Sequence, residues 1–203
     1  MKPTEYEKNV LITESSDMDA IMGRIDPVMV RLLHAGLGLS SELAEIKESL
    51  LKGKRESYVD YVNLREECGD LAWYTAVAIH ALGQDPEKIW PKWGNEDGNT
   101  LFATPDSIED TFNVLTINVG EFNNLIKRTL FYGKSQPVSL WTESLESIAV
   151  ALSGLALNCG SYMAAVRATN IGKLKFRYND KFTEAAALNR DVVTERSILE
   201  NGS

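Results

Sequence analysis

Two pairs of acidic residues in this chain have a spacing suited to binding a cation. Glu42 and Glu45 are three residues apart, and so are Glu67 and Asp70. On a helix, side chains three residues apart lie on one face, with Cβ atoms about 5–6 Å apart. If two such helices lie side by side, four carboxylates converge, and a divalent cation relieves their mutual repulsion. An all-oxygen ligand set favours Mg²⁺ or Mn²⁺ over Zn²⁺, which points toward phosphate chemistry.

Helical periodicity predicts the elements that carry these pairs. Asp26 and Pro27 are typical of a helix start, and apolar residues recur at helical spacing from there to Lys52, with Gly53 as the stop. A second helix is expected over about 58–82, ending at a glycine. Since no segment alternates in the manner of a strand, we expect an all-α fold.

The sequence also contains a degenerate repeat of this helix pair. Residues 46–54 and 126–134 are identical at five of nine positions, and 64–83 aligns with 141–160. We interpret the repeat as a second helix pair that lost most of the acidic residues, so that both pairs pack as a pseudo-twofold four-helix bundle. The alternative is chance similarity between amphipathic helices that end in Gly-Lys. With one residue inserted, the positions equivalent to the acidic pairs are Glu121, Asn124, Ser144 and Ser147.

The bulk composition is that of a globular protein without a polyanionic partner. The chain has 203 residues, 44% hydrophobic and 25% charged, with a net charge of −8. Nucleic-acid-binding domains usually carry a basic face instead. The N-terminal residues lack the apolar run of a signal peptide, and the two distant cysteines, Cys68 and Cys159, indicate reduced core thiols. We therefore expect a cytoplasmic protein that binds neither a nucleic acid polymer nor a membrane.

The shortage of histidine argues against other metal and nucleophile chemistries. Only His34 and His80 are present, and neither follows a glutamate by three residues, as a ferritin-like di-iron site requires. Zinc hydrolase motifs and a Ser-His-Asp triad lack the necessary residues for the same reason. The acidic pairs therefore remain the main candidate site.

A basic block near the C-terminus stands out in this acidic chain. Lys173 and Arg177 lie four residues apart and share a helix face. Such a pair can clamp phosphate oxygens. Alternatively, it is a solvated basic face near a helix C-terminus, where the helix dipole favours cations.

Together these motifs resemble the MazG-like branch of the all-α nucleoside triphosphate pyrophosphohydrolases. The resemblance covers about half of the chain and implies an antiparallel helical bundle of that type. The acidic motif is similar to that of the whole superfamily, and the tail is similar to that of bacterial and phage members. The residues that carry the resemblance are Glu42-x-x-Glu45, Glu67-x-x-Asp70 after a gap of 21 residues, the flanking stretches 32–37 and 62–74, and the tail over 170–191.

The resemblance implies the hydrolysis of a nucleoside triphosphate, expected to be a dNTP, to the monophosphate and pyrophosphate. Mg²⁺, replaceable by Mn²⁺, would activate water for attack at the α-phosphorus, and Glu42 or Glu45 would take up the proton. The implied metal ligands are Glu42, Glu45, Glu67 and Asp70. The implied substrate contacts are Asn170, Lys173 and Arg177, with Lys54 in the loop between the acidic helices and His34, Trp73 and Tyr74 as further candidates.

We expect one all-α domain over residues 1–203. A short helix behind an N-cap at Asp17 would precede the rest. In single-unit relatives the tail follows soon after the second acidic helix, whereas about 85 residues intervene here, an arrangement that resembles a fused duplication like that of the dimeric all-α dUTPases. We expect a homo-oligomer, most simply a dimer. The expected parts are a catalytic helix pair over 27–83, a connector with a short helix over 84–107, the degenerate pair over 108–160, and a C-terminal helix with a substrate-binding tail over 161–203.

Two functions outside catalysis stay open at this point. The first is a non-catalytic nucleotide-binding or regulatory protein derived from the same fold, although a binding module need not keep four mutually repelling carboxylates. The second is a helical interaction protein with solvated acidic faces, which would not respond to Mg²⁺ or Mn²⁺.

Overall fold

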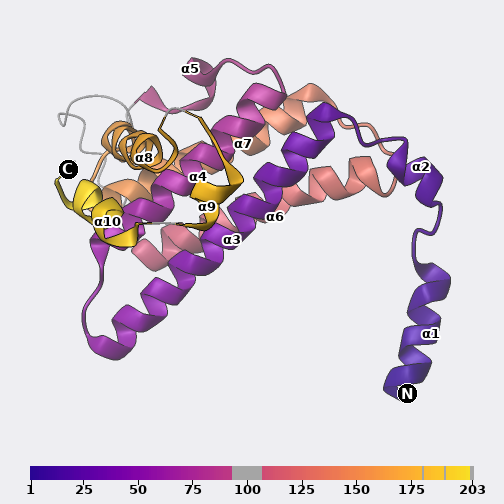
Figure 1. Cartoon of the computed structure of the whole chain (residues 1–203). Helices are drawn as coiled ribbons and strands as arrows, with labels where there is room; N and C mark the ends of the chain where they lie inside the picture. Colours follow the sequence, from indigo (N-terminus) through magenta and orange to yellow (C-terminus); the bar gives the residue numbers. More distant parts are fainter. Residues whose placement is uncertain (93–106, 180, 190, 202–203) are drawn as a thin grey trace.

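The computed structural model describes residues 1–92, 107–179, 181–189 and 191–201, and the regular elements in them are all helices (Figure 1). No strand occurs among these residues, which confirms the all-α class. The helices are α1 (Pro3–Thr13), α2 (Met18–Met22), α3 (Pro27–Glu56), α4 (Tyr61–Ala81), α5 (Pro86–Ile89), α6 (Ile108–Leu130), α7 (Val138–Asn158), α8 (Met163–Tyr178), α9 (Glu184–Leu188) and α10 (Val192–Asn201).

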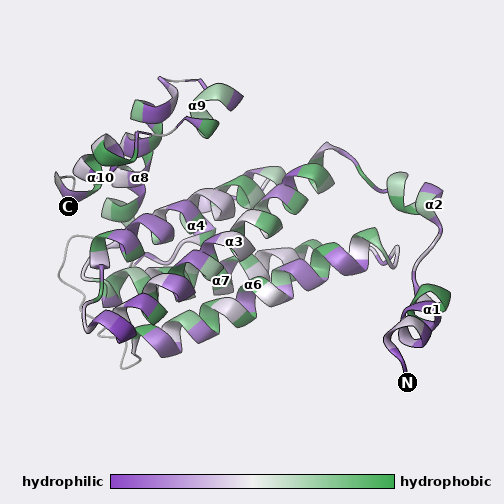
Figure 2. Ribbon diagram, turned by 60° about the horizontal axis from the view of Figure 1, so that its bottom comes forward, coloured by the Kyte–Doolittle hydropathy of each residue, from purple (hydrophilic) through white to green (hydrophobic). Residues whose placement is uncertain are grey.

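Four long helices form the body of the described structure as two hairpins. α3 packs against α4 and α6 against α7, and the hairpins meet where α3 contacts α6 and α4 contacts α7. Hydrophobic residues recur along these helices between hydrophilic ones (Figure 2). Their inward side chains are fully buried, and each contributes about 1.5–3 kcal/mol through burial. Examples are Leu39, Ile46, Leu71, Leu115 and Leu152.

The C-terminal helices attach to the first hairpin. α8 packs on α4 and α7, and α10 packs on α8 and α4 (Figure 1). Segments more than 100 residues apart in the sequence are thereby brought next to the acidic helix α4. The tail therefore lies where it can complete a site that begins on α3 and α4.

Side-chain caps determine where the helices start. The Asp26 carboxylate accepts a hydrogen bond from the Met29 backbone N–H at 2.7 Å, and the Asp17 carboxylate caps α2, as predicted. The second acidic helix begins at Tyr61, later than the expected position 58, because Asp60 is its N-cap and accepts from the Asn63 backbone N–H at 3.1 Å.

The expected stop of α3 at Gly53 is wrong. The helix continues to Glu56 and ends at Ser57, which adopts the left-handed conformation with φ 54°. Gly53 meets a different requirement, because a Cβ atom there would lie 3.1 Å from the Tyr58 carbonyl oxygen and 3.2 Å from a Val59 methyl group. The glycine lets the chain fold back closely against the end of α3.

The N-terminal helix and the connector differ in how they pack. α1 was not expected from the sequence; it buries none of its residues and projects away from the bundle (Figure 1). The expected short helix of the connector is α5, and Trp90 after it is buried, with the Arg167 guanidinium 4.8 Å from its ring centroid. Residues 93–106 of the connector, which include Trp93, lie outside the described residues.

One helix in the described ranges, α7, is long and apolar enough to cross a membrane by length and composition. Within its most apolar window, 61% is buried inside the bundle, as in the core helix of a globular protein. Cys68 and Cys159 are free and buried, in agreement with the expectation of core thiols.

Candidate metal centre

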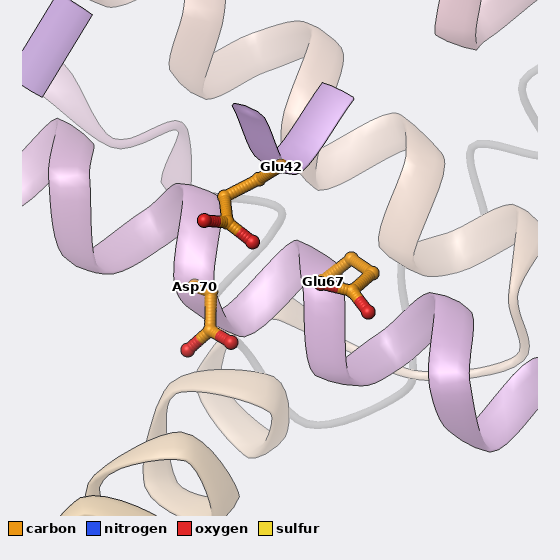
Figure 3. Close-up of side chains that lie close together, drawn as sticks. All are labelled: Glu42, Glu67 and Asp70. Carbon is orange, nitrogen blue, oxygen red and sulfur yellow. The ribbon is translucent and has the colours of Figure 1, made fainter. Parts of the chain in front are cut away.

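Three carboxyl groups converge at the α3–α4 interface. Glu42 extends from α3, and Glu67 and Asp70 extend from adjacent turns of α4 (Figure 3). One oxygen atom of each lies within 4.8 Å of the other two, close enough for a single cation to contact all three. The i, i+3 spacing on α4 and the antiparallel packing of α3 therefore bring together three of the four predicted acidic residues.

The electrostatic environment of the triad favours a proton or a cation. Glu67 is only 6% exposed. Burial, and then the charges of Glu45, Asp70 and other acids, raise the pKa of Glu67 to about 9. Burial and the charge of Asp70 likewise raise the pKa of Glu42, although a hydrogen bond with Glu67 acts in the opposite direction. Without a cation, the carboxyl group of Glu67 is therefore protonated at neutral pH.

Glu45 takes a different position from the other three acidic residues. Its side chain is exposed and is not a member of the convergent triad. It faces the same cleft, and its charge helps to raise the pKa of both Glu42 and Glu67. A carboxylate placed beside the triad, and not within it, can exchange protons with solvent.

Asp70 is held from its other side by α8. The fully buried Lys173 donates from Nζ to both Asp70 oxygens at 2.7 and 2.9 Å, and to Glu66 at 3.2 Å. The Asn170 side-chain amide donates to Asp70 at 2.7 Å. Asn170 approaches so closely because Gly69 has no side chain; a Cβ atom at Gly69 would lie 2.9 Å from the Asn170 Cβ.

The position of Lys173 corrects both sequence interpretations of its role. It is neither a solvated cation nor a group free to clamp phosphate, because Asp70 and Glu66 surround its ammonium group and neutralise it. A buried cation needs such partners, and the acids on α4 supply them. Lys173 therefore supports the acidic residues of α4 and does not face the cleft as a free cation.

Arg177 lies one turn further along α8, at the wall of the cleft. Its Nε and Nη2 donate to the two carboxylate oxygens of Glu195 at 2.7 and 2.6 Å. Glu195 extends from α10 and is buried. Glu195 could not be predicted from the sequence, because a pair between two tail helices leaves no periodic signal.

An aromatic cluster forms another part of the cleft. The rings of His34, Trp73 and Tyr74 meet edge to face, with centroids 5.0–5.8 Å apart. The Tyr74 ring lies directly against the backbone of Gly38, where a Cβ atom would overlap it. The three predicted pocket residues therefore come together and line the cleft.

These groups enclose a cleft with a volume of about 900 Å³. α3 and α4 contribute the acidic triad and Glu45 to its lining, and α8 and the segment after it contribute basic and aromatic residues. Tail residues that line the cleft and were not predicted as substrate contacts include Lys175, Tyr178, Lys181, Phe182 and Val192. The cleft is large enough for a ligand of nucleotide size.

Lys54 does not belong to this site, contrary to the sequence expectation. It lies within α3 and not in a loop, and it is absent from the residues that line the cleft. Its Nζ pairs instead with Glu109 of α6 at 2.7 Å. Because the helix continues past Gly53, Lys54 is turned toward the second hairpin.

Comparisons with known proteins add no assignment: no family model, no curated protein and no solved structure matches the chain.

Proposed function

We propose that the protein is an Mg²⁺-dependent nucleoside triphosphate pyrophosphohydrolase that converts a (d)NTP to the (d)NMP and pyrophosphate. The observation that carries the proposal is the convergence of Glu42, Glu67 and Asp70 beside a cleft with basic and aromatic walls. In the reaction, the oxygen of water forms a bond to the α-phosphorus, and the bond from that phosphorus to the bridging oxygen of the leaving pyrophosphate breaks.

The donor set fits a hard divalent cation. The three carboxyl groups supply only oxygen atoms as ligands. The raised pKa of the buried Glu67 shows that the positive groups nearby do not balance the negative charge of the triad. We infer that Glu42, Glu67 and Asp70 would hold Mg²⁺, with Mn²⁺ as a substitute and Glu45 as an additional ligand. When bound, the ion would neutralise phosphate charge and lower the pKa of the attacking water.

The remaining side chains have separable roles in this proposal. Lys173 and Asn170 fix the orientation of Asp70 through three hydrogen bonds. Glu45, exposed beside the triad, is the preferred proton acceptor for water, with Glu42 as the alternative. Arg177, Lys175 and Lys181 would contact phosphate oxygens. The aromatic cluster of His34, Trp73 and Tyr74 would contact the base.

We further propose that α6 and α7 are the degenerate copy of α3 and α4. We align each residue of α3 with the one 80 positions later in α6, and each residue of α4 with the one 77 positions later in α7. The support for the proposal is that buried residues coincide in this alignment. Without an inserted residue, Glu42 then aligns with Phe122 and Glu45 with Leu125, both buried. The Phe122 ring centroid lies 5.8 Å from that of Trp141. Pairs that are buried in both copies include Leu39 and Val119, Ile46 and Ile126, Leu71 and Ile148, and Ala78 and Leu155.

The alternative is a non-catalytic nucleotide-binding or regulatory protein. It is favoured by one observation, namely that Lys173 already neutralises Asp70 without any metal. In that case the cleft would bind a nucleotide, and no pyrophosphate would appear at any metal concentration.

Pyrophosphate release from a panel of canonical and modified dNTPs and NTPs, with Mg²⁺ or Mn²⁺, tests the proposal. We expect turnover of one or a few substrates that is lost in Glu67→Gln, which removes one ligand while keeping its shape. Glu109→Gln is the matched control, since Glu109 lies in α6 and pairs with Lys54. Release that is equal in Glu67→Gln and in the wild type would refute the proposal. Nucleotide binding without release would favour the alternative.

A further inference from the structure

The C-terminal helix α10 holds one edge of the Arg177 guanidinium. Glu195 accepts hydrogen bonds from Nε and Nη2, and the two distances of 2.7 and 2.6 Å are those of a charge-assisted bidentate pair. The Glu195 side chain is 2% exposed and that of Arg177 is 12% exposed. A pair with this geometry and burial does more than neutralise the guanidinium, because it also holds the plane of the group in one orientation.

α10 itself is anchored independently of this pair. Arg196 donates to both oxygens of Asp60, the N-cap of α4, at 3.0 and 3.1 Å, and Leu199 is buried. The helix that carries Glu195 is therefore tied to the same helix that carries Glu67 and Asp70. This arrangement sets the position of Arg177 relative to the acidic triad.

Beside this pair, the guanidinium carbon of Arg177 lies 5.8 Å from the centroid of the Tyr178 ring. Arg177 and Tyr178 are both part of the cleft wall, together with Lys175 and Lys181. We propose that Glu195 is a positioning residue: by holding Nε and Nη2 of Arg177, it fixes the guanidinium at the cleft wall, where Arg177 would contact the phosphates of a bound nucleotide. This inference rests on the proposed function, in which Arg177 contacts phosphate. Glu195 does not itself touch the substrate.

Binding of inorganic tripolyphosphate with Mg²⁺, measured by calorimetry, tests the inference apart from catalysis. We expect Glu195→Gln to weaken binding about tenfold, the loss typical of one hydrogen bond to a charged group. In turnover assays the same variant should raise KM much more than it lowers kcat. In an Arg177→Ala background, Glu195→Gln should have no further effect, because Glu195 acts through Arg177.

Arg196→Gln is the control for a merely structural role. It weakens the attachment of α10 to Asp60 and leaves the Glu195 pair in place, so tripolyphosphate binding should stay within about twofold of the wild type, the range expected when a partly exposed ion pair is lost. Equal losses in Glu195→Gln and Arg196→Gln would overturn the inference, and so would tighter binding by Glu195→Gln. A wild-type chain that does not bind tripolyphosphate would also overturn it. Failure of the proposed function would appear differently, as wild-type protein without pyrophosphate release.

Discussion

Glu67 is the side chain in which burial and like charge act together most strongly. It has little contact with solvent, and Glu42, Glu45, Glu66 and Asp70 all raise its pKa. A buried carboxyl group in this environment is neutral until a cation replaces its proton. The proposed metal binding and the protonation of Glu67 are therefore two alternatives for the same site.

We expect the metal-free protein to become less stable as the pH rises from about 5 to about 9. The pKa of Glu67 is about 9 in the folded chain against an ordinary 4.5, so the folded state holds an extra proton in this interval. The free energy of unfolding then falls with increasing pH. Urea unfolding with EDTA at pH 5, 7 and 9 measures the effect. Glu67→Gln should flatten the decrease, whereas Glu109→Gln should keep it; equal slopes in all three proteins would contradict the assignment.

Removing the buried ammonium of Lys173 should be strongly destabilising. Lys173→Met keeps most of the side-chain volume but leaves Asp70 and Glu66 without their shared cation. Breaking a buried pair from one side costs about 3–5 kcal/mol. Urea denaturation at neutral pH measures this loss, with Lys54→Met as the control because Lys54 forms an exposed pair. A loss below about 1 kcal/mol, typical of exposed pairs, would show that Lys173 is not buried as described.

The residue types and spacing at this scale predicted much of the site, but not its partners. The i, i+3 pairs indicated Glu42, Glu67 and Asp70 because helical periodicity acts over one turn. Glu45 shares the same spacing, yet it stays outside the triad because the crossing of α3 over α4 decides which turn faces inward. The contacts of Lys173 with Asp70 and of Arg177 with Glu195 depend on the docking of tail helices, for which the sequence has no local signal.

At the scale of elements, close approaches at glycines set the distances between helices. Gly38 admits the Tyr74 ring onto α3, and Gly69 admits Asn170 onto α4. The sequence indicated the helices but not these contacts, since a glycine inside a helix is compatible with many roles. Helix starts followed from capping residues such as Asp26, whereas the end of α3 did not follow from Gly53.

Gly38→Ala should disturb the cleft as well as stability. The added methyl group would displace the Tyr74 ring and the aromatic cluster, and overpacking of this kind costs about 1–3 kcal/mol. Gly120→Ala is a matched control, because Gly120 lies inside α6 and a methyl group added there would meet no neighbouring side chain within 4 Å. That change should stabilise the protein by up to about 1 kcal/mol through helix propensity. Thermal melting of both variants gives the comparison; similar melting temperatures would contradict the close contact.

At the scale of the whole molecule, a single chain completes the bundle. Both hairpins contribute fully buried residues to one core, so no second copy is needed to cover it. The expected dimer, which stays a prediction, would add to a core that is already formed.

We therefore expect the monomer to be folded by itself, so that the melting temperature stops falling once dilution has separated the expected dimer. In an obligate dimer without a stable monomer, melting shifts with concentration by mass action. Scanning calorimetry over a hundredfold concentration range separates the two cases. A steady rise in melting temperature with concentration would show that folding and association are coupled.

The apolar character of the second hairpin has a consequence for how the chain tolerates change. Where the first hairpin has Glu42 and Glu45, the proposed alignment places Phe122 and Leu125, which pack into the core. Packing alone can thus shape the second hairpin, whereas the first hairpin keeps mutually repelling carboxyl groups together for the proposed reaction. In a mutational scan, substitutions in α6 and α7 should change activity only in proportion to the amount of folded protein. Substitutions in α3 and α4 should also change the activity per folded molecule.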